Sequence, residues 1–292
     1  MTSSGHSNRV IVTRPAHDAA DWVARLQQCG VNAQALPLIE IVAISSPADT
    51  SALQQAIARL HTYAACMFVS PNAVAHFVKV FIESNMPTVL IKAALVAPVN
   101  IANYLPGHLR FLAPGPGTVT ALLAAGIPAS QIDAPPPEAA QFDSEALWQV
   151  VGTNNWRDAR VLIVRGKGDA ADTSTGAGRD WLASQWRASG ATVEVVSSYE
   201  RRVPCLLPAQ IEVAKSASHD GTVWLFSSSE AVINLTSQAG LKAMSWQGAR
   251  AIATHPRIEA AVHAAGWGVV QPSRPNLPDI IQALASIEST AI

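Results

Sequence analysis

The sequence has few charged residues and almost no excess of either sign. Aspartate, glutamate, lysine and arginine make up 14% of the 292 residues, and the formal net charge is −1. The broad basic surface of nucleic-acid-binding proteins is therefore not expected, and neither is a nucleic-acid partner. Hydrophobic residues account for 49% of the chain, which is enough for two packed cores and excludes a disordered protein. An anionic ligand must be held by local groups.

Cysteines, a leader sequence and long apolar runs are also scarce or missing. Cys29, Cys66 and Cys205 are far apart and form no C-x-x-C or Cys/His cluster, which is typical of reduced thiols in a cytoplasmic protein. Residues 1–8 are polar and unlike a secretory signal. The longest apolar runs, such as Ala93–Val99, are broken well short of a membrane span. We expect a cytoplasmic protein without a membrane partner.

Several motifs that mark nucleotide, metal and hydrolase sites are absent. The turn at 114–118, PGPGT, has neither the P-loop spacing nor G-x-G-x-x-G, and no acidic residue stands where a ribose would need one. H-E-x-x-H and G-x-S-x-G do not occur, and the eight histidines are scattered. The sequence therefore predicts no cofactor and no metal site.

The chain instead contains a strand–turn–helix pattern that occurs twice. VIVTRP (10–15) matches VLIVRG (161–166), FVSPNAV (68–74) matches FSSSEAV (226–232), and PGPGTVTALLAAG (114–126) matches THPRIEAAVHAAG (254–266). These matches align Arg14 with Arg165 and Ser70 with Ser228. Chance similarity of generic β/α units is the alternative, but order, spacing and turn type all recur. We predict two similar α/β domains.

Apolar periodicity predicts the elements of these domains. Strands are expected at 9–13, 65–70, 160–164, 222–226, 250–253 and 268–272, and helices at 17–29, 51–63, 73–81, 119–125, 144–150, 179–189, 211–216, 230–238, 258–265 and 277–287. Residues 31–41 are predicted as one strand interrupted at Pro37, and 191–204 as a strand that carries Tyr199.

The turns after the strands suit anion binding. The carboxyl ends of parallel strands meet at one sheet edge, where the first N–H groups of each helix lack intrahelical partners and favour anions. Arg14 and Arg165 end matching strands and can pair with carboxylates. The small or hydroxyl residues in such turns are Ser70, Asn72, Gly115, Gly117, Thr118, Ser227, Ser228, Ser229 and Thr254, and His255 is the only histidine there. Simple helix capping remains the alternative for each of them.

Taken together, these stretches resemble the uroporphyrinogen-III synthase family. FDSEALW (142–148), VSSYERRVP (196–204) and WLFSSSEAVINL (224–235) also match, and the resemblance covers nearly the whole chain. It implies an α/β fold of two similar flavodoxin-like parallel-sheet domains, joined by a two-stranded linker with a cleft between them. Mapped onto this chain, residues 1–36 and 205–292 form a discontinuous domain, 42–196 form the other, and 37–41 and 197–204 are the connecting strands.

The resemblance also implies a reaction. The family cyclises hydroxymethylbilane, a linear tetrapyrrole with eight carboxylates, to uroporphyrinogen III in tetrapyrrole (haem) biosynthesis, with loss of water, inversion of ring D and no cofactor. It implies that Tyr199 is the general acid, with a packing tyrosine on a linker strand as the alternative reading, and that the protein is a monomer. The substrate-binding residues expected are Arg14, Ser70, Asn72, Gly117, Thr118, Arg165, Ser227, Ser228, Ser229, Thr254 and His255.

Departures from the family pattern leave other readings open. GDAADTSTGAG (168–178) follows Arg165-Gly166, either as a mobile flap or as a tolerated loop, and Thr254-His255-Pro256 replaces a hydroxyl-rich turn. Residues 86–110 match poorly. A two-domain small-molecule-binding protein, or a regulator that has the fold without the activity, would share the duplicated pattern.

Overall fold

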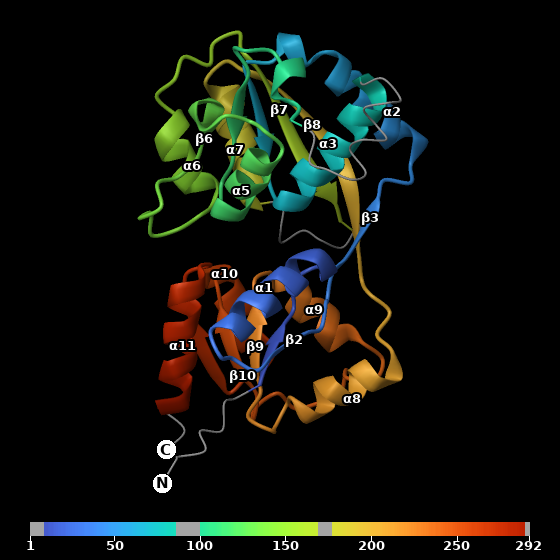
Figure 1. Cartoon of the computed structure of the whole chain (residues 1–292), viewed down its shortest axis with the longest axis vertical. Coiled ribbons are helices and arrows are strands. Elements are labelled where there is room, and N and C mark those ends of the chain that lie inside the picture. The colour runs from blue at the N-terminus through green and yellow to red at the C-terminus, as the bar shows by residue number, and fades with distance from the viewer. Residues whose placement is uncertain (1–8, 86–99, 169–176, 290–292) are drawn as a thin grey trace. The chain divides into compact units, whose positions relative to one another are not determined.

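The computed structural model describes residues 9–85, 100–168 and 177–289 (Figure 1). Two compact units make up the chain: unit 1 comprises Met1–Glu40 with Arg202–Ile292, and unit 2 comprises Ile41–Arg201. The polar start at 1–8, most of the 86–110 segment and residues 169–176 of the 168–178 insertion lie outside the described residues.

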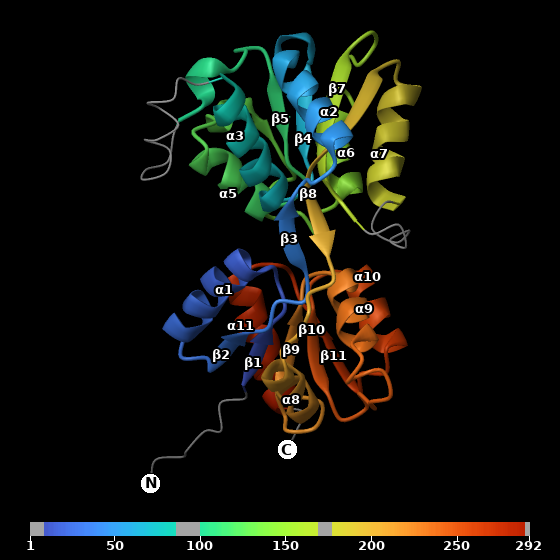
Figure 2. The same cartoon turned by 90° about the vertical axis from the view of Figure 1, so that its right-hand side faces the viewer.

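Unit 1 is a parallel sheet covered on both faces by helices (Figure 2). The strand order is β11 (Val269–Pro272), β10 (Arg250–Ala253), β9 (Val223–Phe226), β1 (Val10–Val12), β2 (Ala33–Ala35). Helices α1 (Ala16–Gln28) and α11 (Leu277–Ser289) pack on the face that carries Val10, Val12 and Leu225. The chain also forms α8 (Pro208–Ser216), α9 (Ser229–Ser237) and α10 (Pro256–Ala264) in this unit. Trp224 and Phe226 lie on the other face and stack with each other.

Unit 2 has the same layered architecture with one additional edge strand. Its sheet order is β3 (Glu40–Ala43), β8 (Thr192–Arg202), β7 (Arg160–Lys167), β4 (Ala65–Phe68), β5 (Arg110–Leu112), β6 (Ile132–Asp133). One face packs against α2 (Pro47–Ala58), α3 (Pro71–Asn85) and α5 (Pro116–Ala124). The other packs against α6 (Ser144–Val151) and α7 (Ala177–Ala188). Alternate residues of β4 and β7 enter the two cores, as the period of a strand requires.

The duplicated pattern is confirmed by the order of the strands. In unit 1 the order β2-β1-β9-β10-β11 corresponds to β8-β7-β4-β5-β6 in unit 2, and both are the flavodoxin-like order 2-1-3-4-5 once β1 and β7 are taken as first strands. The matched glycines share a left-handed backbone after their helices, with φ of +88° at Gly126 and +94° at Gly266. The copies differ in chain order, since β4–β6 precede β7 and β8 whereas β1 and β2 precede β9–β11.

The prediction of a single strand over 31–41 is wrong. Residues 33–35 form β2 in the sheet of unit 1, whereas Glu40–Ala43 form β3 in the sheet of unit 2. Between them the Leu36 and Leu38 amides donate to the Val12 and Thr13 carbonyls at 3.0 and 3.2 Å. The chain thus follows β1 past Pro37, which has no N–H to donate, before it enters the second sheet. Helix α2 also begins earlier than predicted, because the Ser46 hydroxyl accepts the Asp49 amide at its start.

Candidate functional site

The two central strands of unit 2 form a topological switch point at the carboxyl edge of the sheet. β4 pairs with β7 in parallel, but the helices that follow them, α3 and α7, pack on opposite faces. Open α/β sheets bind ligands at such a switch point. Ser70 follows β4, and Arg165 lies in the last part of β7. Ser70 and Arg165 therefore both lie at this edge of the sheet.

Tyr199 of β8 reaches this position. Its hydroxyl oxygen lies 3.0 Å from the Ser70 Oγ, and the residue is only 4% exposed. Ser70 Oγ also accepts the Ala73 amide at 3.1 Å and so caps α3. The His76 ring of α3 lies beside the tyrosine ring, with 5.6 Å between their centroids. Burial and the nearby Lys79 charge lower the pKa of His76, which favours the neutral imidazole.

The starts of α3 and α5 lie close together at the same edge. A β-carbon at Gly117 would contact the Pro71 ring carbon Cγ at 3.3 Å, so a larger residue at 117 would crowd the start of α3. Asn72 is half-buried in the first turn of α3, and Thr118 is buried in the first turn of α5. Two helix N-termini with small or amide side chains can together receive an anion.

The basic residues after β7 are partly engaged in ion pairs. An Arg165 guanidinium nitrogen lies 3.8 Å from an Asp180 carboxylate oxygen, and Asp180 is largely exposed. Lys167 donates to Asp49 at 2.6 Å, and this hydrogen bond raises the pKa of the lysine. Arg165 is thus the better placed of the two cations for a ligand, because its ion pair is long and exposed.

Unit 1 has its own switch point between β1 and β9, where an arginine and hydroxyl residues again follow the strands. Arg14 follows β1, and the residues after β9 are Ser227, Ser228 and Ser229, all half-buried. The Arg14 guanidinium lies over the Trp22 ring, 4.8 Å from its centroid, and burial lowers the pKa of the arginine. Its buried Nε has no hydrogen-bond partner among the described residues. A carboxylate would supply that missing partner.

Three predicted ligand residues of unit 1 use their side chains within the protein. The buried Thr254 hydroxyl donates to the Phe226 carbonyl at 3.3 Å. His255 Nδ1 accepts the Arg257 amide at 3.1 Å and caps α10, and Ser228 likewise caps α9 by accepting the Glu230 amide. His255 and Ser228 are thus helix caps and Thr254 bonds to a strand carbonyl, while the N-termini of α9 and α10 lie at the carboxyl edge of their sheet.

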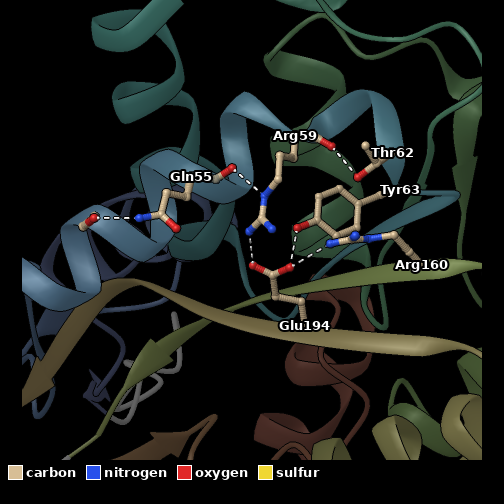
Figure 3. Close-up of polar contacts among 7 residues, drawn as sticks. Gln55, Arg59, Thr62, Tyr63, Arg160 and Glu194 are labelled. Atoms are coloured by element: carbon tan, nitrogen blue, oxygen red, sulfur yellow. Dashed lines mark hydrogen bonds and ion pairs between the residues drawn. The ribbon is translucent and has the colours of Figure 1, made fainter.

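A second polar cluster lies at the opposite, amino edge of the unit 2 sheet (Figure 3). Glu194, near the start of β8, accepts hydrogen bonds from Arg59 at 2.9 Å, Tyr63 at 2.7 Å and Arg160 at 3.3 Å. The Arg160 guanidinium also lies over the Tyr63 ring. Burial and the Glu194 hydrogen bond raise the pKa of Tyr63 to about 12. Because this cluster lies at the amino edge and the candidate site lies at the carboxyl edge, we assign the cluster a structural role.

The sequence did not identify two neighbours of Tyr199: Gly166, where a β-carbon would meet the tyrosine ring, and His76. The sequence contained one hint of Gly166, because the duplicated pattern has glycine at 166 where it has Pro15 in the other copy. His76 had none, since its approach to Tyr199 depends on packing between a helix and a distant strand. Among the residues described, no group of three or more His, Cys, Asp or Glu side chains is arranged to hold a metal ion, and no helix is long and apolar enough to cross a membrane.

Fold and site together define a class of protein: a two-unit α/β protein with flavodoxin-like sheets, in which a buried tyrosine bonded to a serine marks the switch point of one unit. The family model described as uroporphyrinogen-III synthase HemD matches residues 20–282. Because this match spans most of the sequence, the chain belongs to the uroporphyrinogen-III synthase family.

Solved structures of this family have a similar fold. A mutant uroporphyrinogen III synthase from Thermus thermophilus is 13% identical with a TM-score of 0.54, covering 97% of this chain and 99% of that one. The enzyme from Helicobacter pylori is 14% identical with a TM-score of 0.50, covering 97% and 100%. At such identities the likeness concerns the fold.

The activity is that of the family: a cyclising lyase of tetrapyrrole biosynthesis that converts hydroxymethylbilane to uroporphyrinogen III. The comparisons lend no support to the alternative of a binding protein without catalytic activity.

Proposed function

We propose that Tyr199 is the general acid of the cyclisation and that the sheet-edge turns hold the substrate. The observation that carries the proposal is the 3.0 Å contact between the Tyr199 hydroxyl and Ser70 at the switch point of unit 2. Tyr199 is otherwise enclosed by core side chains, so its polar end is the part that faces the ligand-binding edge. A neutral phenol in this position can donate a proton to a departing hydroxyl.

The chemistry needs one proton at the start and releases one at the end. The C–O bond of the ring A hydroxymethyl group breaks as Tyr199 protonates the leaving hydroxyl, which departs as water. Ring D attacks the resulting azafulvene cation, and a spiro intermediate allows ring D to be inverted. When ring D regains aromaticity it loses a proton, which restores the phenol. The protein's main task is to hold one conformation of the chain, because positioning supplies much of the barrier reduction in such ring closures.

Ser70 is suited to orient this phenol. Its Oγ already accepts the Ala73 amide, so its own hydroxyl hydrogen is available for the Tyr199 oxygen. In that arrangement the phenol proton points away from Ser70, toward the substrate. A donor on the phenolic oxygen also stabilises the phenolate that forms, and hydrogen bonds to charged groups contribute about 1.5–3 kcal/mol. Ser70 then acts on Tyr199, which refines its predicted role as a carboxylate ligand.

The carboxylates of the substrate are the natural ligands of the sheet-edge turns. Arg14, with its unpartnered buried Nε, supports this assignment most strongly. Each helix N-terminus adds about 0.3–1 kcal/mol, so several must act together. The remaining residues proposed to bind substrate are Asn72, Gly117, Thr118, Arg165, Ser227, Ser228 and Ser229, with the turn formed by Thr254 and His255.

We propose further that the protein acts in the cytoplasm as a monomer, without a nucleic-acid, membrane or cofactor partner, and that residues 37–41 and 197–204 connect its domains. The net charge of −1 supports the absence of a nucleic-acid partner. The adjacency of β3 and β8 in one sheet supports the paired connection. Size-exclusion chromatography with light scattering tests the monomer, and a mass of twice 30.7 kDa would contradict it.

Incubation with hydroxymethylbilane, followed by oxidation and separation of the isomers, tests the activity. We expect type III porphyrin, and a type I product equal to the enzyme-free control would refute the assignment. Tyr199→Phe should lower kcat by about 10²–10⁴-fold, the usual contribution of a general acid, without loss of fold. Tyr104→Phe is the matched control, because Tyr104 is 49% exposed in the same unit. Full turnover by Tyr199→Phe would remove Tyr199 as the acid.

A further inference from the structure

Gly166 lies directly beneath the ring of Tyr199. A β-carbon at position 166 would overlap the ring and lie 2.8 Å from the phenolic oxygen, closer than real β-carbons approach other atoms. The Tyr199 ring has little room to retreat, because it is 4% exposed and has the His76 ring beside it. The absence of a side chain at 166 is therefore what allows the phenol to occupy its place next to Ser70.

The pairing of β7 with β8 explains why these two residues meet. Arg165 pairs with Ser197 and Gly166 pairs with Tyr199, so Ser198 is an additional residue on β8. Such a bulge reverses the alternation of side chains beyond it. Val196 and Tyr199, which would face opposite sides of a regular strand, consequently enter the same core. The Ser198 hydroxyl donates to the Ala73 carbonyl at 3.3 Å and ties the bulge to the start of α3.

We infer that Gly166 is a positioning residue of the reaction, which acts through Tyr199 by leaving its hydroxyl free to sit at the switch point beside Ser70. This inference rests on the proposed role of Tyr199 as the acid. The bulge turns the tyrosine toward α3, and the glycine sets how close its ring lies to the sheet. A displacement of the acid by about 1 Å can cost on the order of 10²-fold in rate, so one methyl group is enough to matter.

A double-mutant cycle between positions 166 and 199 tests the inference. Gly166→Ala should lower kcat for type III formation by roughly 10²-fold, with KM changed little, because the proton donor moves while the substrate-binding turns stay. In the Tyr199→Phe background the same substitution should leave kcat unchanged. Phenylalanine keeps the ring that the β-carbon meets, so any loss of thermal stability should appear in both backgrounds. A role in structure alone would lower stability without this dependence on the phenol.

Gly152→Ala is the matched control for steric crowding. Its β-carbon would lie 2.7 Å from the Trp148 carbonyl oxygen in the same unit, at the end of α6 and away from the tyrosine. We expect it to lower stability and leave kcat at the wild-type value. If Gly166→Ala does not fold, the Gly166→Ala/His76→Ala pair gives the ring room to shift, and its kcat should lie well below that of His76→Ala alone.

The outcomes separate the inference from the proposed function. Wild-type kcat for folded Gly166→Ala, or an equal loss in both the Tyr199 and Phe backgrounds, would overturn the inference while a slow Tyr199→Phe still supports the acid. Full activity of Tyr199→Phe would instead overturn the proposed acid itself. A loss confined to the tyrosine background supports both.

Discussion

Ser70 makes two hydrogen bonds at once, one to the backbone of α3 and one to Tyr199. The same side chain therefore contributes to the stability of unit 2 and to the orientation of its proposed acid. Sequence reasoning treated capping and function as competing explanations for such a serine. Here the cap fixes the serine oxygen, and the fixed oxygen holds the phenol, so the two explanations are linked.

Substitution of Ser70 separates its two roles. Ser70→Ala should lower kcat by about tenfold or more through loss of a hydrogen bond to a developing charge, with KM nearly unchanged. It should also lower the free energy of unfolding by about 1 kcal/mol through loss of the cap. Steady-state kinetics and denaturant unfolding measure the two effects, and Ser70→Thr should retain most of both.

The cap of α2 provides the control, because the Ser46 hydroxyl accepts the Asp49 amide, whereas the Ser70 hydroxyl bonds both a helix amide and Tyr199. Ser46→Ala should show the loss of stability without the loss of rate. An increase in KM at unchanged kcat for Ser70→Ala would contradict the orienting role and return Ser70 to the substrate ligands.

At the scale of elements, Glu194 joins three segments of unit 2. It accepts hydrogen bonds from Arg59 after α2, Tyr63 before β4 and Arg160 at the start of β7 (Figure 3). The cluster makes the stability of the unit depend on pH in the alkaline range, because the folded state holds the Tyr63 proton more tightly than the unfolded chain does. Its contribution to stability is complete below pH 10, the ordinary pKa of tyrosine, and is lost as pH rises toward about 12.

Tyr63→Phe should remove this alkaline dependence. We expect the urea midpoint of the wild-type protein to fall more steeply than that of Tyr63→Phe between pH 9.5 and about 11.5, since only the wild type loses this proton. At neutral pH the variant should be less stable, because Glu194 loses one of its three donors. Its kcat should match the wild type, because the cluster lies at the amino edge. Parallel pH profiles for the two proteins would contradict the assignment.

At the scale of the whole molecule, the two units depend differently on the continuity of the chain. Unit 2 is one segment, Ile41–Arg201, with its own cores on both faces of its sheet. Unit 1 needs two distant segments, because β1 lies between β9 and β2 and α1 covers the same core as α11. Without residues 1–40, β9 would become an exposed edge, and Trp22 and Leu26 would be missing from the core.

Expression of fragments tests this difference. Residues 41–201 should fold alone with a cooperative thermal transition, whereas residues 202–292 should not, and co-expression with residues 1–40 should restore the fold. Circular dichroism and amide NMR dispersion report the outcome for each fragment. A cooperative transition of residues 202–292 alone would show that β1 and α1 are dispensable for this unit.

The sequence by itself determined the features that depend on neighbours along the chain. Apolar periodicity located most strands and helices, the matched turns gave the duplication, and glycines such as Gly126 and Gly266 marked helix ends through a left-handed backbone. Tyr199 was a functional candidate only through the resemblance to the family, whereas the turn motifs placed Ser70 and Arg14 among the candidates. These are local properties, set by side-chain pattern and backbone sterics within a few residues.

Only the tertiary structure decided what depends on pairing between distant segments. The bulge at Ser198 exists because β8 pairs with β7 in a particular register, and it alone turns Tyr199 to the face that carries Ser70. The fit of Gly166 beneath the phenol follows from that same register. Likewise, residues past Pro37 still bond to the segment after β1, and the chain joins the second sheet only at β3. A strand's periodicity gives two faces but not which face meets which partner, so these features required the folded chain.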